Sequence, residues 1–204
     1  MLSKLFSKKQ QYSEEAISIL RLIRSENVGI KTFFSLIGLY GNATTALNYI
    51  EELSLKGGKK KPVKKYSMKE VEQELQLLEK YGARLITFKD QEYPKMLLQI
   101  SDPPPVITTI GNIGLLNTPC VAIVGARNAS VNGCFFAKKI ANKLAELGIT
   151  VVSGMARGVD TAAHEASIEK ATIAVLAGGV DHIYPPENEV LYNQIKEKGL
   201  LLAE

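Results

Sequence analysis

The stretch CVAIVGARNAS, residues 120–130, is an apolar run that leads into a glycine and then a serine able to cap a helix. Similar apolar runs recur further along the chain, and each is followed by a segment with helical spacing of its apolar residues. The sequence predicts strands at 120–124, 149–152, 172–176 and 200–203, which alternate with helices at 131–147, 161–170 and 187–198. Such alternation is typical of a parallel sheet covered on both faces, so we expect a Rossmann-like, doubly wound α/β domain.

Length and composition place the chain among ordinary globular proteins. Its 204 residues carry 25 basic and 21 acidic side chains, a formal net charge of +4, and 46% of them are hydrophobic, which excludes a disordered or collagen-like chain. No apolar run reaches the about 18 residues of a bilayer-spanning helix, and residues 1–12 lack the apolar core of a secretory signal. Cys120 and Cys134 fall in segments expected to be buried, so we expect no disulfide framework. These features predict a soluble cytoplasmic protein with no membrane contact.

Positive charge is concentrated before residue 67. Residues 1–66 hold 12 basic and 5 acidic side chains, and six of the lysines lie between positions 56 and 65. Gly57, Gly58 and Pro62 exclude a regular helix there and the lysines repel one another, so we expect an extended, solvated linker at 56–66. We favour a basic tether, and an electrostatic arm for nucleic-acid phosphates is the alternative.

The linker separates two expected domains. Residues 1–55 predict a small all-α domain whose glycine-containing turns are typical of SAM or helix-hairpin-helix modules. We favour a packing or protein-interaction role for this domain, whose first helix is capped by Ser13 and is expected to bury Ile17, Leu20 and Ile23.

Residues 67–204 are expected to form the Rossmann-like domain. It begins with a capping box between Ser67 and Glu70 and a helix that ends near Gly82. The helix predicted at 131–147 is expected to bury a face made of Phe136, Ile140, Leu144 and Leu147.

Glycine-rich segments follow three of the predicted strands, at 125–130, 153–160 and 178–185. Ligands of such folds bind beyond the carboxyl ends of the strands, and the helices that follow present N-terminal amides to an anion. Arg127 and Arg157 add guanidinium groups that bind phosphate oxygens, and Gly178 allows close backbone approach. The segments therefore predict a site for a phosphate-bearing ligand.

Several polar residues of these segments also have ordinary structural explanations. Ser130 and Asp160 are suited to cap helices, and we favour a structural role for His164. Asp181 and Tyr184 are suited to fix the shape of their loop.

Absent motifs restrict the chemistry further. The sequence has no Gly-x-Gly-x-x-Gly after the first strand, no P-loop, no zinc-binding spacing of His and Cys, and no nucleophile beside a base within a motif. We therefore expect a binding protein with no catalytic residues, no cofactor and no metal.

Residues 121–130 (VAIVGARNAS) resemble the segment VAIVGSRxxS of the bacterial DNA-processing protein A (DprA/Smf) family. Residues 152–164 (VSGMARGVDTAAH) resemble its VSGxARGIDxxAH signature, and residues 172–188 are similar to its TIAVLGxGxDxxYPxxN segment. The resemblance extends from about residue 82 to Glu204 and is compatible with a SAM-like domain before it.

This resemblance implies single-stranded DNA binding without catalysis. Family members protect incoming strands during natural transformation, help load a RecA-type recombinase, and act as homodimers through the Rossmann-like domain. Carried over to this sequence, Asp160 and His164 shape the DNA-contacting loops, and the contacting residues are Gly125, Arg127, Ser130, Ser153, Gly154, Ala156 and Gly158.

The sequence departs from the family pattern in two places. Ala126 replaces a small hydroxyl residue, and the further strands and FPxRN segment of the family do not follow Glu204. The resemblance thus predicts a truncated Rossmann-like domain, with the apolar residues 200–202 at or near an uncovered sheet margin. The alternatives are an inactive fragment or a nucleotide-processing hydrolase of the lysine-decarboxylase-like (LOG) group. The PGGxGTxxE loop of that group has no full equivalent at 177–181.

Overall fold

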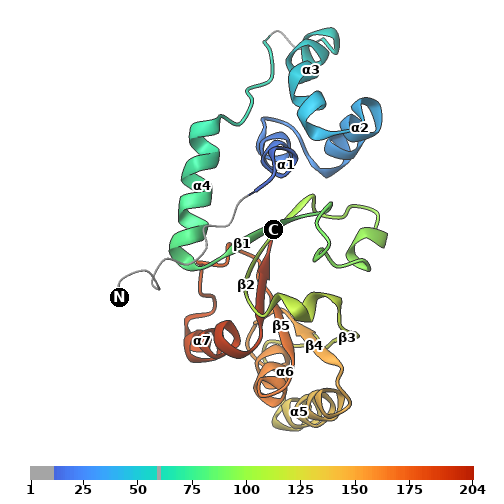
Figure 1. Cartoon of the computed structure of the whole chain (residues 1–204). Helices are drawn as coiled ribbons and strands as arrows, with labels where there is room; N and C mark the ends of the chain where they lie inside the picture. The colour runs from blue at the N-terminus through green and yellow to red at the C-terminus, as the bar shows by residue number, and fades with distance from the viewer. Residues whose placement is uncertain (1–11, 59–60) are drawn as a thin grey trace. The chain divides into compact units, whose positions relative to one another are not determined.

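The computed structural model describes residues 12–58 and 61–204, which fall into two compact units (Figure 1). The first unit runs to Leu77 and includes Ser101–Val106, and the second comprises Leu78–Ile100 and Ile107–Glu204. The domain boundaries expected from the sequence, at 55 and 66, stay predictions. Among the described residues, no helix is both long and apolar enough to cross a membrane.

The first unit is helical and is built from α1 (Glu14–Arg24), α2 (Ile30–Tyr40) and α3 (Ala43–Lys56). Ser13 caps α1 as expected, since its Oγ accepts a hydrogen bond from Ala16 N at 3.1 Å. The buried face of α1 differs from the prediction: Leu20 is buried, but Ile17 and Ile23 are only partly so. Because α1 contacts both α2 and α3, its buried surface is wider than one stripe and also takes in Ala16, Ile19 and Leu22.

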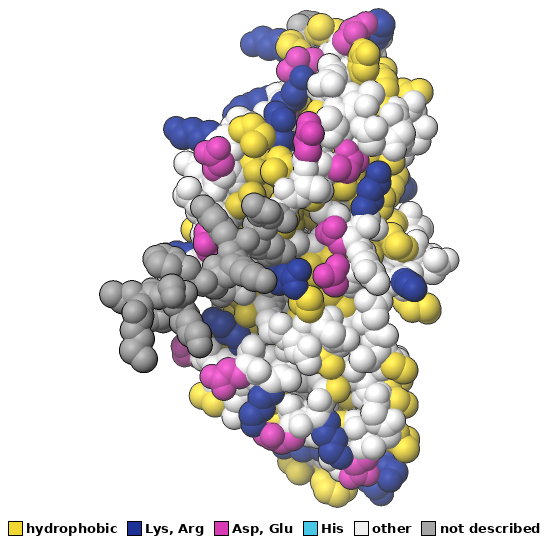
Figure 2. Space-filling view, in the orientation of Figure 1, with side chains coloured by type: hydrophobic (Ala, Val, Ile, Leu, Met, Phe, Trp, Pro, Cys, Tyr) yellow, Lys and Arg dark blue, Asp and Glu magenta, His cyan; other side chains and the backbone are white. Residues whose placement is uncertain are grey.

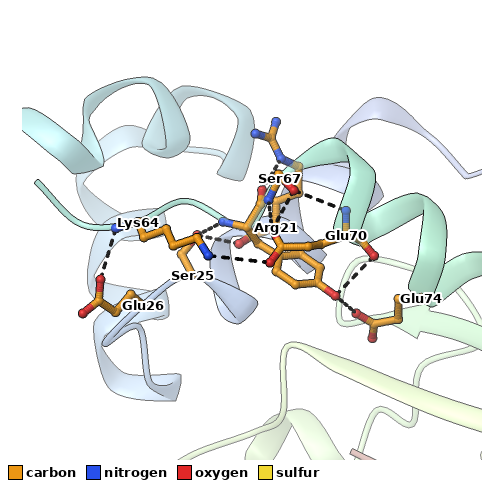
Figure 3. Close-up of polar contacts among 8 residues, drawn as sticks. Arg21, Ser25, Glu26, Lys64, Ser67, Glu70 and Glu74 are labelled. Carbon is orange, nitrogen blue, oxygen red and sulfur yellow. Dashed lines mark hydrogen bonds and ion pairs between the residues drawn. The ribbon is translucent and has the colours of Figure 1, made fainter.

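The segment 61–67, here called the strap, follows α3 and is held against the first unit (Figure 3). Tyr66 N donates to Ser25 Oγ at 3.2 Å, and Arg21 Nε donates to Tyr66 O at 3.0 Å. The side chain of Val63 is buried, and its N–H donates to Ser54 Oγ at 3.1 Å. Residues 61–67 form neither a helix nor a strand, as expected, and Lys61, Pro62 and Lys64 are exposed. The segment is nevertheless not a free tether, because backbone groups of Val63 and Tyr66 find partners on Ser54, Ser25 and Arg21.

Lysines of the basic segment also meet acidic partners. Lys56 Nζ lies 2.6 Å from Glu52, Lys65 Nζ lies 3.3 Å from Glu51, and Lys64 Nζ lies 4.0 Å from Glu70. On the face drawn in Figure 2, basic and acidic side chains of this unit lie interspersed. Three of the four described lysines of the segment thus lie near a carboxylate. Lys59 and Lys60 lie outside the described residues.

Helix α4 (Met68–Tyr81) follows the strap, and its capping box is confirmed. Ser67 N donates to Glu70 Oε2 at 2.8 Å, and Glu70 N donates to Ser67 Oγ at 3.3 Å. Beyond α4, the second unit is a six-stranded sheet in the order β1-β2-β6-β5-β4-β3. Its strands are β1 (Arg84–Thr87), β2 (Val106–Gly111), β3 (Cys120–Ala122), β4 (Thr150–Ser153), β5 (Thr172–Val175) and β6 (Leu200–Ala203).

Strands β3 to β6 are parallel neighbours, so the expected Rossmann-like α/β class is confirmed. Strand β2 was not predicted, and it pairs antiparallel with β6, which makes the sheet mixed. Leu200 and Leu201 are fully buried between β2 and β5. The expectation that residues 200–202 lie at an uncovered margin is therefore wrong, because β2 covers that edge.

Three helices lie side by side on one face of the sheet: α5 (Val131–Glu146), α6 (Val159–Ser167) and α7 (Glu189–Lys198) (Figure 1). On this face, Val151 of β4 packs against α5 and α6, and Leu201 of β6 packs against α7. The opposite face carries no α-helix of the second unit; Ile173 and Leu200 pack there on the 3-10 helix η2 (Ile113–Asn117) and on Tyr93, near the shorter η1 (Leu97–Gln99). The sheet is covered on both faces, but one cover is short helices and loops.

Helix α5 buries its small residues. Ala137, Ala141 and Ala145 are buried, whereas Phe136 and Leu147 are 62% and 66% exposed. The predicted apolar face of this helix is therefore wrong for Phe136 and Leu147, whereas Leu144 is partly buried and packs against the core. Alanines allow α5 to approach α6 and β4 closely, which leaves Phe136 and Leu147 exposed. Cys120 on β3 is exposed and Cys134 partly so; both are free.

Candidate functional site

Three loops leave the carboxyl ends of the parallel strands β3, β4 and β5. They are the first loop (residues 125–130), the second loop (153–160) and the third loop (178–185), and the 3-10 helix η3 (Pro186–Asn188) follows the third. Because the strands are parallel, all three loops lie at the same edge of the sheet.

Two glycines bring the first and second loops into contact. Gly158 has φ +80°, and a Cβ atom there would lie 2.3 Å from Ala126 O. A Cβ atom at Gly125 would lie 2.7 Å from Val159 Cγ2. The N–H of Val159 donates to Ala126 O at 3.3 Å. Both glycines are therefore explained by close packing between the two loops.

The amides of the second loop are used within the protein. Asp160 Oδ2 accepts hydrogen bonds from Gly154 N at 3.2 Å and from Ala156 N at 3.3 Å. Asp160 is buried, and Met155 between these amides has φ +64°, the left-handed region. The carboxylate thus shapes the loop, and these two N–H groups are directed inward to it.

The first loop has the donors that a ligand would find free. Arg127 is exposed, and within the described part of the chain its guanidinium has no hydrogen bond or ion pair. The same holds for the backbone N–H groups of residues 125–129. Ser130 caps α5, since its Oγ accepts from Gly133 N at 3.1 Å. The N-terminus of this helix therefore adds its positive dipole end to the loop.

Two predicted residues are buried below the loops. Ser153 Oγ donates to Ile123 O at 2.6 Å, which ties the ends of β3 and β4 together. His164 is fully buried, with Nδ1 2.7 Å from Thr172 Oγ1. Burial lowers the pKa of His164 to about 4, so the ring is neutral at pH 7. Neither side chain faces solvent, so both support the loops from inside.

The third loop is mostly exposed. Gly178, Asp181 and Tyr184 lie at the surface, and Gly178 packs beside His182. Tyr192 from α7 donates its hydroxyl to Val180 O. The three atoms nearest to a Cβ built at Gly178 all belong to His182 of the same loop.

Residues that the sequence did not single out connect η3 to the second loop. Glu187 Oε1 lies 3.5 Å from Arg157 Nη1, and Asn188 Nδ2 donates to Met155 O at 2.8 Å. Thr161 Oγ1 donates to Ala156 O at 2.8 Å. For Asn188 a signal was present, since the final Asn of the family segment TIAVLGxGxDxxYPxxN falls on it. For Thr161 the available signal is a polar residue at the start of a predicted helix, which suggests only a cap.

Taken together, these groups form a site suited to an anion. Arg127 and Arg157 project from loops in contact, beside free backbone amides and a helix N-terminus. Within the described residues, no group of three or more His, Cys, Asp or Glu side chains is arranged to hold a metal ion. Hydrogen-bond donors of this kind bind phosphate groups without reading base edges.

Comparison with known proteins gives consistent matches over both units. The family model described as DNA recombination-mediator protein A matches residues 84–204, and that of the DprA-like N-terminal HHH domain matches residues 13–76. Protein Smf of Synechocystis sp. is 39% identical over 127 residues, which cover 59% of this chain and 32% of the relative. DNA processing protein DprA of Streptococcus pneumoniae is 40% identical over 117 residues, 56% of this chain and 41% of the relative. The chain therefore spans well under half the length of these relatives.

Two solved structures share the fold. The X-ray structure of DprA from Streptococcus pneumoniae has a TM-score of 0.69 and 25% identity. The match covers 91% of this chain and 65% of the Streptococcus pneumoniae chain. A structure of DNA processing protein A from Helicobacter pylori, which concerns that protein's single-stranded DNA binding mode, has a TM-score of 0.54 and 34% identity. The match covers 59% of this chain and 55% of the Helicobacter pylori chain. Because the first family model matches more than half of the residues, the chain belongs to the DNA recombination-mediator protein A family, which includes the DprA and Smf proteins.

Proposed function

We propose that this protein binds the phosphate backbone of single-stranded DNA at its first and second loops. The observation that carries the proposal is the first loop, where Arg127 is exposed and precedes the N-terminus of α5, and where its guanidinium and the backbone amides have no partner among residues 12–58 and 61–204. Arg157 adds a second guanidinium from the loop in contact. Donors of this kind track a polyanion and are indifferent to sequence.

The comparisons support this proposal. The Helicobacter pylori relative, 34% identical, is described by its mode of single-stranded DNA binding. The proposed activity is binding without catalysis, which agrees with the burial of Asp160 and His164 and their hydrogen bonds within the protein.

The proposal extends to the biology that the family resemblance implies. It includes protection of incoming single-stranded DNA in the cytoplasm, loading of a RecA-type recombinase, and action as a homodimer. These are proposals for the whole protein, since the chain spans 32% and 41% of the two relatives' lengths.

Arginine substitution tests the proposed contact. We expect Arg127→Ala to weaken binding of a fluorescent oligo(dT) about fivefold or more, because charge-assisted contacts to phosphate are lost. The slope of log affinity against log salt should also fall by about 0.7, the value for one lost single-strand phosphate contact. Fluorescence anisotropy over a salt series measures both quantities.

Arg84→Ala is the matched control. Arg84 lies on β1 and pairs with Glu92 at 3.7 Å, so its removal changes the net charge equally without touching the loops. Equal loss in the two variants would mean that binding follows net charge alone, and unchanged binding by Arg127→Ala would place the site elsewhere. Release of a base from a nucleoside monophosphate by the pure protein would favour the hydrolase alternative.

A further inference from the structure

Helix η3 places one buried side chain against the second loop. Asn188 is 6% exposed, and its Nδ2 donates to Met155 O at 2.8 Å and to Thr161 Oγ1 at 2.9 Å. Both hydrogens of this amide are thus used. Since η3 follows β5 while Thr161 belongs to α6, Asn188 connects the second loop to a separate part of the chain.

Met155 is the residue that most needs such support. Its φ of +64° lies in the left-handed region, which is unfavourable for a residue with a side chain. Its side chain is buried in the core shared with Leu201 and Tyr192. A backbone in this conformation persists only when surrounding contacts hold it there, and such positions are concentrated at functional sites.

The neighbouring peptide groups are held from α6. Thr161 Oγ1 donates to Ala156 O, and Asp160 Oδ2 accepts from Gly154 N and Ala156 N. Asn188 completes this set by holding the carbonyl of Met155. Three side chains therefore fix three consecutive residues of the loop, immediately before Arg157.

We infer that Asn188 is a positioning residue for the anion site. It keeps the Met155 carbonyl turned inward, and this fixes the direction in which Arg157 leaves the loop. Without the donor, Met155 relaxes from the left-handed region, the following peptide rotates, and a carbonyl oxygen turns toward the bound phosphate. The consequence for DNA binding rests on the proposed function, whereas the consequence for the loop does not.

Helix capping is the competing explanation, and aspartate separates the two. Asn188 is the N-cap residue of α7 but makes no side-chain cap hydrogen bond. Aspartate caps a helix as well as asparagine does. It has no N–H to offer to Met155 O, so Asn188→Asp keeps a residue suited to the N-cap position and removes the donor.

The experiment compares Asn188→Ala and Asn188→Asp with the parent chain. We expect amide hydrogen exchange at Gly154 and Ala156 to be about tenfold faster in both variants, because a buried hydrogen bond that holds the loop is lost. We expect oligo(dT) affinity to fall about tenfold in both. Amides of β5 and β6, in the same unit as Asn188, report unfolding of that unit and should exchange as in the parent.

Asn142→Ala is the matched control, since Asn142 on α5 loses only an exposed hydrogen bond to Glu146. It should change neither readout. The inference is overturned if Asn188→Asp behaves as the parent, if Gly154 and Ala156 keep parental exchange in Asn188→Ala, or if exchange rises while affinity stays parental. A parent chain that does not bind oligo(dT) contradicts the proposed function instead, and the exchange data then decide the role of Asn188 in the loop.

Discussion

At the scale of single residues, the polar side chains of the site have two kinds of role. Ser153, Asp160 and His164 are buried and bind groups within the protein. Arg127 and Arg157 are exposed and project from the loops. The division is physical: a buried polar group must find a partner inside the fold, whereas a guanidinium at the surface is free to exchange water for a ligand.

Removal of the Glu187 charge is expected to strengthen DNA binding. Its carboxylate lies 3.5 Å from Arg157 Nη1, with the two side chains 60% and 58% exposed, so the pair is weak but competes with a phosphate for the same guanidinium. We expect Glu187→Gln to tighten oligo(dT) binding about two- to fivefold at low salt, and the gain should shrink as salt rises. Anisotropy titrations at two salt concentrations measure it.

Glu169→Gln is the control for that prediction. Glu169 is an exposed glutamate paired with Lys198. Its substitution by glutamine removes the same charge at a position away from the loops. A gain of the same size in both variants would assign the effect to net charge, and no gain in Glu187→Gln would argue against a phosphate at Arg157.

His164 predicts a pH dependence of stability. Burial lowers its folded-state pKa from 6.5 to about 4, so the unfolded chain binds a proton at a higher pH than the folded chain does. The free energy of unfolding should therefore be unaffected by this group above pH 6.5 and fall as pH drops from 6.5 to 4, by up to about 3 kcal/mol. Chemical denaturation at several pH values measures the trend.

Variants assign that trend to one residue. His164→Gln cannot titrate and should flatten the stability profile in this window, whatever its own stability. His182→Gln removes the exposed histidine and should leave the profile unchanged. A parental slope in His164→Gln would show that other groups cause the acid instability.

At the scale of elements, α5 links the site to the sheet through its cap. Ser130 was predicted both as a DNA contact and as a cap, and its Oγ is bonded to Gly133 N. We expect Ser130→Ala to lower the free energy of unfolding by about 1 kcal/mol and to change oligo(dT) affinity little.

Ser130→Asp keeps the cap and should retain stability, but its charge beside the first loop should weaken binding. Thermal melts and anisotropy measure the two effects; an affinity loss in Ser130→Ala equal to that of Arg127→Ala would make Ser130 a direct contact.

Elements with local signals were predicted well. The caps at Ser13 and Ser130 and the capping box at Ser67 depend on residues three positions apart, and all three are present. The buried face of α5 was not predicted, because spacing alone does not distinguish a large apolar face from the alanine face that packs on α6. The strap was also not predicted, since its partners Ser25 and Ser54 are distant in sequence.

At the scale of the whole molecule, the parallel part of the sheet followed from the alternation of strands and helices, but its partners did not. Pairing of β2 with β6 joins Thr108 to Ala203 and Gly111 to Leu200, across about half the chain. No local pattern specifies such a contact, so residues 200–202 were wrongly expected at an edge. The three loops lie at one edge of the sheet as expected, because parallel strands fix where their loops begin, and the anion site there stays a prediction.

We propose that the N–H groups and the guanidinium of the first loop, together with the N-terminus of α5, bind a polyanion, and that the second loop positions them. Titration of the ¹⁵N-labelled protein with oligo(dT), followed by amide chemical shifts, tests it most directly. We expect the largest shifts at residues 125–129 and in the first turn of α5, with small shifts at the amides of Gly154 and Ala156, which donate to Asp160. Shifts confined to α1, α2, α3 or the strap, with the first loop unchanged, would contradict it.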